Sequence, residues 1–250
     1  MSLEAEVPTG RIPVPSVDGS LGTKLLPVVL SVTAGSADVI GFLSLGGLFT
    51  AHITGNLVIL AAHVVTGGEA QVAPMLSVPV FMAVLGAARL LAGGLESFGL
   101  ASLRPLLLLQ FLLLAGFLAI CVAAGPRLDP NAPNAIFAGM LGVSAMAVQN
   151  TLVQISLKGA PATAVMTTNI TRFMMDVGEV LLGRDLESVA KARGRAGRTW
   201  PAIVGFAAGC ALGAACEARL GLWSLALPAG LALLALAMAP ADSIDGGQRG

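Results

Sequence analysis

Six apolar stretches, each about as long as a membrane-spanning helix, constrain this chain more than any other feature. A helix needs about 20 mostly apolar residues to cross a hydrocarbon core of about 30 Å. Lipid offers the backbone no hydrogen-bond partner, so a spanning segment must satisfy its own polar groups, and helix is expected for all six. The sequence therefore predicts an all-α, polytopic integral membrane bundle. The stretches are 25–45, 75–95, 105–124, 135–155, 200–216 and 220–239.

Composition agrees with lipid as the surrounding solvent. Hydrophobic residues make up 56% of the chain and charged residues only 11%, whereas ordinary soluble domains are about 25% charged. The formal net charge is zero, so nothing draws the whole molecule toward nucleic acid. The lipid bilayer is the expected partner, and no nucleic acid is expected.

The chain divides into one membrane domain and two tails. Residues 1–24 hold acidic side chains and several prolines before any apolar run. A signal peptide instead has a basic start followed by an apolar core, so we expect a disordered cytosolic segment. The membrane domain is expected at 25–240, followed by a disordered tail at 241–250.

Two further segments have the length of short helices but are too polar for comfortable contact with lipid. Segment 52–65 holds both histidines of the chain, and segment 165–182 carries Arg172, Asp176 and Glu179. We expect both to lie among the spanning helices as half or re-entrant helices.

The sequences before these two segments are related. Shifted by 113 positions, residues 46–56 overlay residues 159–169. This indicates an internal repeat, with one copy at 25–124 and the other at 135–239. The identical pairs, five of the eleven, are Gly46/Gly159, Thr50/Thr163, Ala51/Ala164, Thr54/Thr167 and Asn56/Asn169.

Lysine and arginine orient such a chain, because cytoplasmic loops carry an excess of them. The loop expected at 183–199 holds five basic residues and is therefore assigned to the cytoplasm, together with both termini. Two threadings satisfy this assignment. Eight spanning helices give parallel halves, whereas six spanning helices plus the two short ones give inverted halves. The six-helix threading also places Arg104 and Lys158 inside, and we prefer it.

Asp38 lies in the middle of the first apolar stretch. A carboxylate at the centre of a spanning helix costs about 2.5–3.5 kcal/mol on insertion scales, so it is expected to face protein or water. One interpretation is a proton or ion site. The other is a hydrogen-bonded carboxyl that pins the glycine-rich turn.

The most specific motifs are Thr54-Gly55-Asn56 and Thr167-Thr168-Asn169. A glycine-rich or proline-containing break followed by Thr and Asn is typical of a helix start. Breaks at matching positions in two halves of a membrane protein indicate a transporter binding site near the bilayer midplane. Alternatively, the Thr and Asn residues only cap two helices that pack together.

A polar stripe follows each motif. Asn169, Arg172 and Asp176 share one helix face, and Asn56 and His63 are likewise seven residues apart. Such stripes are able to line a common aqueous cavity. The alternatives left open are an Arg172–Asp176 ion pair, or a pair between Arg172 and Asp38.

The remaining polar candidates have weaker patterns. His52 and His63 have no metal-ligand spacing around them, and no cofactor or metal is expected. Gln149 and Asn150 end the fourth apolar stretch, where they either line the site or hold helices together. A Gly-x-x-x-Gly pattern at 205–213 marks a close helix contact, either within one chain or between copies of a homo-oligomer.

The chain resembles a known family, the YoaK-like bacterial integral membrane proteins, a domain of unknown function. The resemblance covers about residues 25–240 and is carried by the Asp38 helix with its continuation to Asn56, by Gln149-Asn150-Thr-Leu-Val, and by residues 163–169. Thr168 stands where the family usually has Gly. The resemblance implies a multi-pass protein of the bacterial cytoplasmic membrane, usually with six spanning helices. It implies no established substrate, cofactor or activity.

These observations lead to one functional hypothesis and one rival. The hypothesis is a transporter or channel for a small solute or ion, not an enzyme, because no nucleophile–base pair or metal-ligand spacing is present. The rival is a non-transporting assembly or regulatory protein with a closed polar core. The pathway candidates are Asp38, His52, Thr54, Gly55, Asn56, His63, Gln149, Asn150, Thr167, Thr168, Asn169, Arg172 and Asp176.

Overall fold

The computed structural model describes residues 21–67, 72–126, 128–183 and 185–240. Within these ranges every regular element is a helix. The expected disordered segments lie outside the described residues, except that 21–24 already belong to the first helix. The elements are α1 (Leu21–Ser44), α2 (Ile53–Thr66), α3 (Val72–Ser97), α4 (Leu103–Ala124), α5 (Pro133–Ser156), α6 (Met166–Leu182), α7 (Leu186–Leu220), the 3-10 helix η1 (Gly221–Leu225) and α8 (Ala226–Met238).

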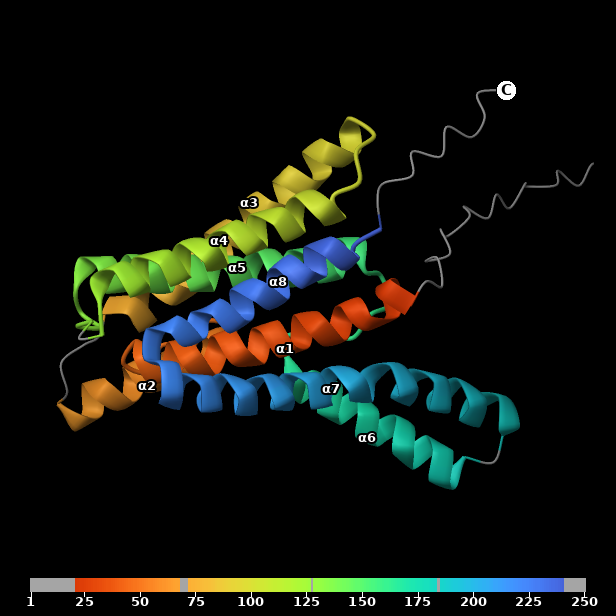
Figure 1. Ribbon diagram of the computed structural model, residues 1–250. Helices are drawn as coiled ribbons and strands as arrows, with labels where there is room; N and C mark the ends of the chain where they lie inside the picture. The colour runs from red at the N-terminus through yellow and green to blue at the C-terminus, as the bar shows by residue number, and fades with distance from the viewer. Residues whose placement is uncertain (1–20, 68–71, 127, 184, 241–250) are drawn as a thin grey trace, which may run out of the picture.

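Five stretches of the described chain are long and apolar enough to cross a membrane. The expectation of a multi-pass helical membrane protein is therefore confirmed. The last stretch contains two helices, because η1 reverses the chain between α7 and α8 (Figure 1). The five stretches are Leu25–Ser44, Val72–Ser97, Leu103–Ala124, Pro133–Ser156 and Leu186–Met238.

The long helices form a bundle in which direction alternates. Following the colours of Figure 1, α1, α4 and α7 run one way, and α3, α5 and α8 run the other way. The short helix α2 follows α1 at one end of the bundle and packs on α3. The short helix α6 follows α5 toward the opposite end and packs on α7.

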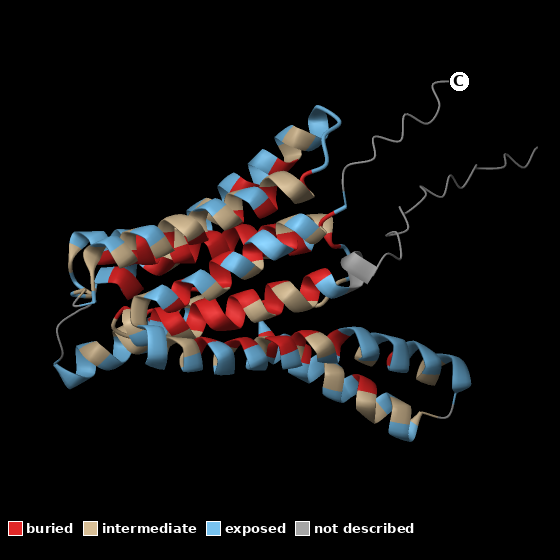
Figure 2. Ribbon diagram, in the orientation of Figure 1, coloured by how far each residue is buried: buried red, intermediate tan, exposed pale blue. Residues whose placement is uncertain are grey.

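Helices α1 and α5 form the centre of the bundle. In α5, 78% of the most apolar window is buried, and in α1 61%, whereas in α3 the share is only 17%. Figure 2 shows the same contrast, with buried residues concentrated along the middle of the bundle. The side of α3 away from α5 exposes large apolar side chains such as Met82 and Leu90. Water would disfavour such a surface, and hydrocarbon accepts it.

The Gly-x-x-x-Gly pattern lies at a contact within this chain, between α7 and α1. A Cβ at Gly209 would overlap the carbonyl oxygen of Val32, and one at Gly213 would lie 3.0 Å from the Cα of Ser36. Only glycine lets the two backbones approach this closely, as is common between helices in lipid. The pattern is therefore explained without a second copy of the chain.

The prediction of a loop at 183–199 is wrong. The structure places most of it in α7, which begins at Leu186 and continues through the apolar part without a break. Asp185 caps this helix by accepting hydrogen bonds from the N–H groups of Ser188 and Glu187, and these bonds hold the pKa of Asp185 below its usual value. Lys and Arg favour helix about as strongly as Leu does, so a basic segment is able to continue a helix. The rise in hydropathy at Trp200 marks where the apolar part begins, not where the helix begins.

Candidate functional site

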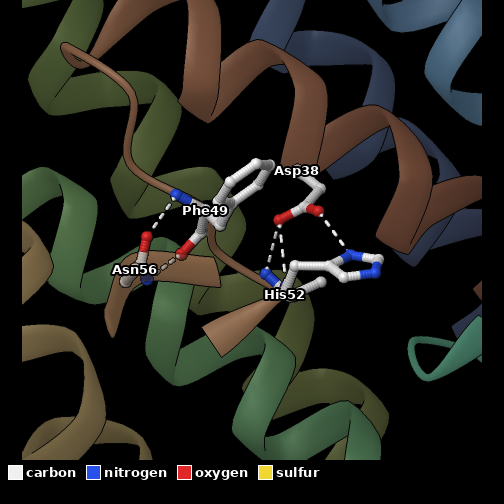
Figure 3. Close-up of polar contacts among 5 residues, drawn as sticks. Asp38, Phe49, His52 and Asn56 are labelled. Atoms are coloured by element: carbon white, nitrogen blue, oxygen red, sulfur yellow. Dashed lines mark hydrogen bonds and ion pairs between the residues drawn. The ribbon is translucent and has the colours of Figure 1, made fainter. Parts of the chain in front are cut away.

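The chain breaks between α1 and α2 at residues 45–52, which we call the first break. Gly46 adopts a φ of 63° there, a left-handed conformation that favours glycine. Asp38 reaches this break from α1, and its side chain is buried, as predicted. Its Oδ1 accepts hydrogen bonds from the N–H groups of Ala51 (2.7 Å) and His52 (3.2 Å) (Figure 3). The carboxylate thus fixes the backbone of the first break to α1.

The other oxygen of Asp38 holds a side chain. Oδ2 lies 2.9 Å from Nδ1 of His52, and this contact raises the pKa of the imidazole above its usual value, against the opposing effect of partial burial. The His52 ring also packs edge-on against Phe206 of α7, with ring centroids 5.5 Å apart. The Asp38–His52 pair therefore joins α1, the first break and α7.

Asn56 fixes the first break from the side of α2. Its Oδ1 accepts from the N–H of Phe49 (2.9 Å), and its Nδ2 donates to the carbonyl oxygen of Phe49 (2.8 Å) (Figure 3). Nδ2 also donates to Oγ of Ser77 on α3 (2.9 Å). The side chain is completely buried, and both of its polar atoms are paired.

The second break, residues 157–165, lies between α5 and α6 and follows the same pattern. Gly159 has a φ of 85°. Asn169 donates from Nδ2 to the carbonyl oxygen of Ala162 (2.6 Å), seven residues earlier, just as Asn56 donates to the carbonyl oxygen of Phe49. The two bonds are related by the same shift of 113 positions as the two sequence motifs.

The two breaks differ in the hydrogen bonds that their asparagines make. Oδ1 of Asn169 is buried and has no hydrogen-bond partner, whereas Oδ1 of Asn56 accepts from a backbone N–H. Asn169 also lines a cavity of about 430 Å³ between α6 and α7, which we call the Asn169 cavity. Neither Asp38 nor Asn56 borders this cavity.

The predicted stripe on the second short helix is brought together there. Asn169, Arg172 and Asp176 all line the Asn169 cavity. Asp176 is buried and pairs with Arg195 of α7, whose Nη2 lies 2.7 Å from Oδ1. Neither pairing considered for Arg172 forms, because Asp176 binds Arg195 and Asp38 binds His52.

The Thr and Asn residues do not cap the short helices, so the alternative interpretation of these motifs as caps is wrong. The N-cap positions are His52 and Val165, and neither side chain makes a capping hydrogen bond. Thr54 and Thr167 lie inside the first turn, one residue after each helix begins. The asparagines follow in the same turn, and their side chains bind the preceding break instead.

Gly55 and Thr168 occupy equivalent positions, and their difference has a local cause. A Cβ at Gly55 would lie 2.8 Å from Cδ2 of Phe49. The residue equivalent to Phe49 is Ala162, which has no ring. The second motif therefore accommodates a side chain at Thr168 where the first motif requires glycine.

Gln149 acts inside the bundle rather than at a cavity. It accepts from Nε2 of Gln110 on α4 (2.7 Å) and donates to the carbonyl oxygen of Leu30 (2.9 Å) and to Oγ1 of Thr163 (2.8 Å). Gln149 and its three partners thus link α5 to α4, α1 and the second break. Asn150 only donates to Met146 of its own helix.

His63, the last of the candidates, stands apart from the first break. It lies near the end of α2, and its Nδ1 is buried without a hydrogen-bond partner. In the part of the chain that the structure describes, no three His, Cys, Asp or Glu side chains gather as metal ligands.

Residues 26–238 match a protein family described as a protein of unknown function, DUF1275. The chain belongs to this family. Within a short stretch it is also similar to the UPF0700 transmembrane protein YoaK of Bacillus subtilis (strain 168), with 62% identity over 32 residues. That stretch is 13% of this chain and 14% of the relative, so the chain spans only a small part of that relative's length. No solved structure matches the chain.

For this member of the family, sequence reasoning missed three partners of the site. Ser77 accepts a hydrogen bond from Asn56, Gln110 donates one to Gln149, and Arg195 forms an ion pair with Asp176. Each partner lies on another helix, so no local motif connects it to the residue it binds. For Ser77 and Gln110 a signal did exist, since each is a polar residue within an apolar spanning stretch and such residues bond across helices.

Proposed function

We propose that this protein moves a small solute or ion across the bacterial cytoplasmic membrane, through a site between the two breaks. One observation carries the proposal. The breaks share a backbone arrangement, yet the first is closed by hydrogen bonds and the second borders a cavity. Two equivalent elements in unequal states are what alternating access through paired halves requires.

The direction of the helices supports inverted halves. In this proposal residues 25–124 form one half and residues 135–239 the other. The helices α1 and α5 begin the two halves and run in opposite directions (Figure 1). Six helices then span, with α2 and α6 as short helices at opposite ends. Inverted repeats with interrupted helices are common among transporters.

The basic part of α7 orients the molecule in this proposal. The first part of α7, which carries Lys191, Arg193, Arg195 and Arg198, lies at one end of the bundle (Figure 1). Cytoplasmic segments carry such excess positive charge. The Asn169 cavity then faces the cytoplasm, both termini are cytoplasmic, and the closed first break lies toward the other side.

Asp38 is the residue whose loss tests transport. Opening the first break requires separation of Asp38 from the Ala51 and His52 N–H groups. The experiment measures proton flux with a pH-sensitive dye, and solute entry by osmotic swelling, in vesicles that contain the purified protein. D38N is expected to abolish the flux that wild type adds over empty vesicles, while R193Q, an exposed change elsewhere, leaves it intact. Flux by D38N equal to wild type removes Asp38 from the mechanism.

The proposed topology has its own test. Single cysteines at positions 52–65 and 165–182, in a variant lacking Cys121, Cys210 and Cys216, are labelled from each side of the membrane. With six spanning helices, each short segment is labelled from one side only, and the two segments from opposite sides. Labelling that changes side along either segment indicates eight spanning helices.

A non-transporting assembly or regulatory protein is the second candidate. The closed bonding around Gln149 and Asp38 favours it, because both side chains are buried and paired within the bundle. Under this alternative, cysteines placed at the first break stay unlabelled from both sides, and wild-type vesicles show no more flux than empty ones.

A further inference from the structure

The Asn169 cavity combines uncompensated positive charge with one buried acceptor. Its wall includes Arg172, Arg195 and Arg198, against a single carboxylate, Asp176. Arg195 already pairs with that carboxylate through Nε (2.8 Å) and Nη2 (2.7 Å). Among the described residues, Arg172 and Arg198 make no ion pair. Two guanidinium groups at the cavity are therefore free to bind an anion.

The neighbouring charges do not cancel this excess. Arg198 also borders a shallow hollow that contains Glu187, but Glu187 pairs with Lys191 at 2.5 Å. Glu179 lies on α6 nearer its C-terminus, where its Oε1 accepts from Ser188. Neither carboxylate borders the Asn169 cavity.

The orphaned oxygen of Asn169 adds a second requirement for the ligand. The side-chain amide cannot be turned around without loss, because Nδ2 donates to Ala162 at 2.6 Å. Oδ1 is thus left as a buried acceptor on a residue that lines the cavity. A buried polar atom without a partner is rare in folded proteins, and a missing ligand is one of its ordinary explanations. The missing group must donate a hydrogen bond.

We propose that the Asn169 cavity binds a phosphate group that carries a hydroxyl, with Arg172 and Arg198 on its charged oxygens and Asn169 Oδ1 accepting from its O–H. Arginine suits phosphate because its planar fork donates two parallel hydrogen bonds. The hydroxyl belongs either to a protonated soluble phosphate or to the headgroup of an anionic phospholipid, such as phosphatidylglycerol. This site stands whether or not the protein transports anything.

Sulfate separates this proposal from simple charge attraction. It has the shape and charge of phosphate, but at neutral pH it has no O–H to donate to Asn169. Binding of inorganic phosphate and of sulfate to the full-length protein is measured by calorimetry in phosphatidylcholine nanodiscs. We expect phosphate to bind about tenfold more tightly than sulfate, as one unmet buried acceptor implies. Equal binding of the two ions, or no phosphate binding, overturns the proposal.

Arginine variants locate the site. R172Q and R198Q are each expected to weaken phosphate binding about tenfold, and R193Q, on α7 but outside the cavity, leaves it unchanged. All three side chains are exposed, so folding is not at risk. Phosphate binding by the R172Q/R198Q double variant equal to that of R193Q overturns the assignment.

The source of the phosphate is decided by repeating the titration in nanodiscs that contain phosphatidylglycerol. If the headgroup is the ligand, it competes and the binding of inorganic phosphate is lost. If a soluble phosphate is the ligand, binding persists. Either result supports the site once the sulfate and arginine comparisons have succeeded.

Discussion

The two breaks of this protein have the same backbone bond and opposite surroundings. At the first break, Asn56 has every polar atom paired, and Asp38 and His52 hold the loop from the other side. At the second break, Asn169 donates to the preceding carbonyl and weakly to the sulfur of Met166, its Oδ1 has no partner, and it borders a cavity lined by arginines. Two similar motifs therefore differ in that the first is closed by hydrogen bonds and the second borders a cavity.

The difference lies in whether the neighbouring helix supplies a hydrogen-bond partner for the asparagine. Helix α3 places Ser77 within 2.9 Å of Asn56. At the equivalent face, α7 brings Thr199 to the Asn169 cavity, but the Thr199 hydroxyl donates to Arg195 of its own helix. The residues of the motif define the shape of the break, and the facing helix decides whether it is closed.

The largest expected contrast comes from removing each asparagine. N56L leaves the N–H and carbonyl of Phe49 without partners, so we expect it to lower the free energy of unfolding by about 3–5 kcal/mol. N169L removes one bond and is expected to cost about 1 kcal/mol. Reversible unfolding in bilayers measures both. Equal losses would mean that the two breaks are equally closed.

Exchanging the small residues of the two motifs is expected to have the next largest effect. G55T brings a side chain into contact with the Phe49 ring and should cost about 1–3 kcal/mol. In an F49A background, which copies Ala162, the same change should cost less than about 0.5 kcal/mol. The double-mutant cycle measures this coupling. No coupling would show that Phe49 is not the reason for glycine at this position.

Deleting one hydroxyl on each facing helix tests whether that helix stabilises the break. S77A removes the acceptor for Asn56 Nδ2 and is expected to cost about 1 kcal/mol. T199A removes only a bond within α7 and should change stability by less than about 0.5 kcal/mol. Thermal unfolding in detergent ranks the two. A larger loss for T199A would reverse the assignment of closed and open breaks.

The smallest expected effect is a titration shift at the first break. Asp38 raises the pKa of His52, so the pair stabilises the fold below the pKa of a free imidazole, and this contribution is lost as pH rises through the raised pKa. NMR titration of H63N, in which His52 is the remaining histidine, should show a lower pKa when D38N is added. An unchanged pKa would mean that the contact in Figure 3 does not persist in solution.

Local patterns predicted much of this fold. Apolar runs located the long helices to within a few residues, except for the first half of α7. The shift of 113 positions predicted the two breaks, and the short helices at 52–65 and 165–182 differ from α2 and α6 by one residue at each misplaced end. These features depend on residues close together in sequence, so the sequence displays them directly.

The chemistry of the site was predicted less well. The burial of Asp38 followed from the cost of a charge in lipid, and its bonds to the Ala51 and His52 N–H groups agree with the interpretation of a carboxyl that pins the glycine-rich turn. The side chain of His52 was not among the partners considered. The bond between Asn56 and Phe49 replaced the expected helix cap, and Arg195 replaced Arg172 beside Asp176. Both outcomes depend on the angle at which a chain leaves a glycine turn or crosses a neighbouring helix, which one sequence does not encode locally.

The pairing of the central helices also has a consequence for biosynthesis. Helix α1 packs on α7 and α8, and α5 packs on α3 and α4. Helix α1 is therefore synthesised well before the two helices on which it mainly packs. Until those helices are made, Asp38 has its nearby partners in the first break, but the His52 ring lacks its contact with Phe206 of α7. Nascent chains that stop before residue 200 are expected to be substrates for membrane proteases rather than stable half-proteins.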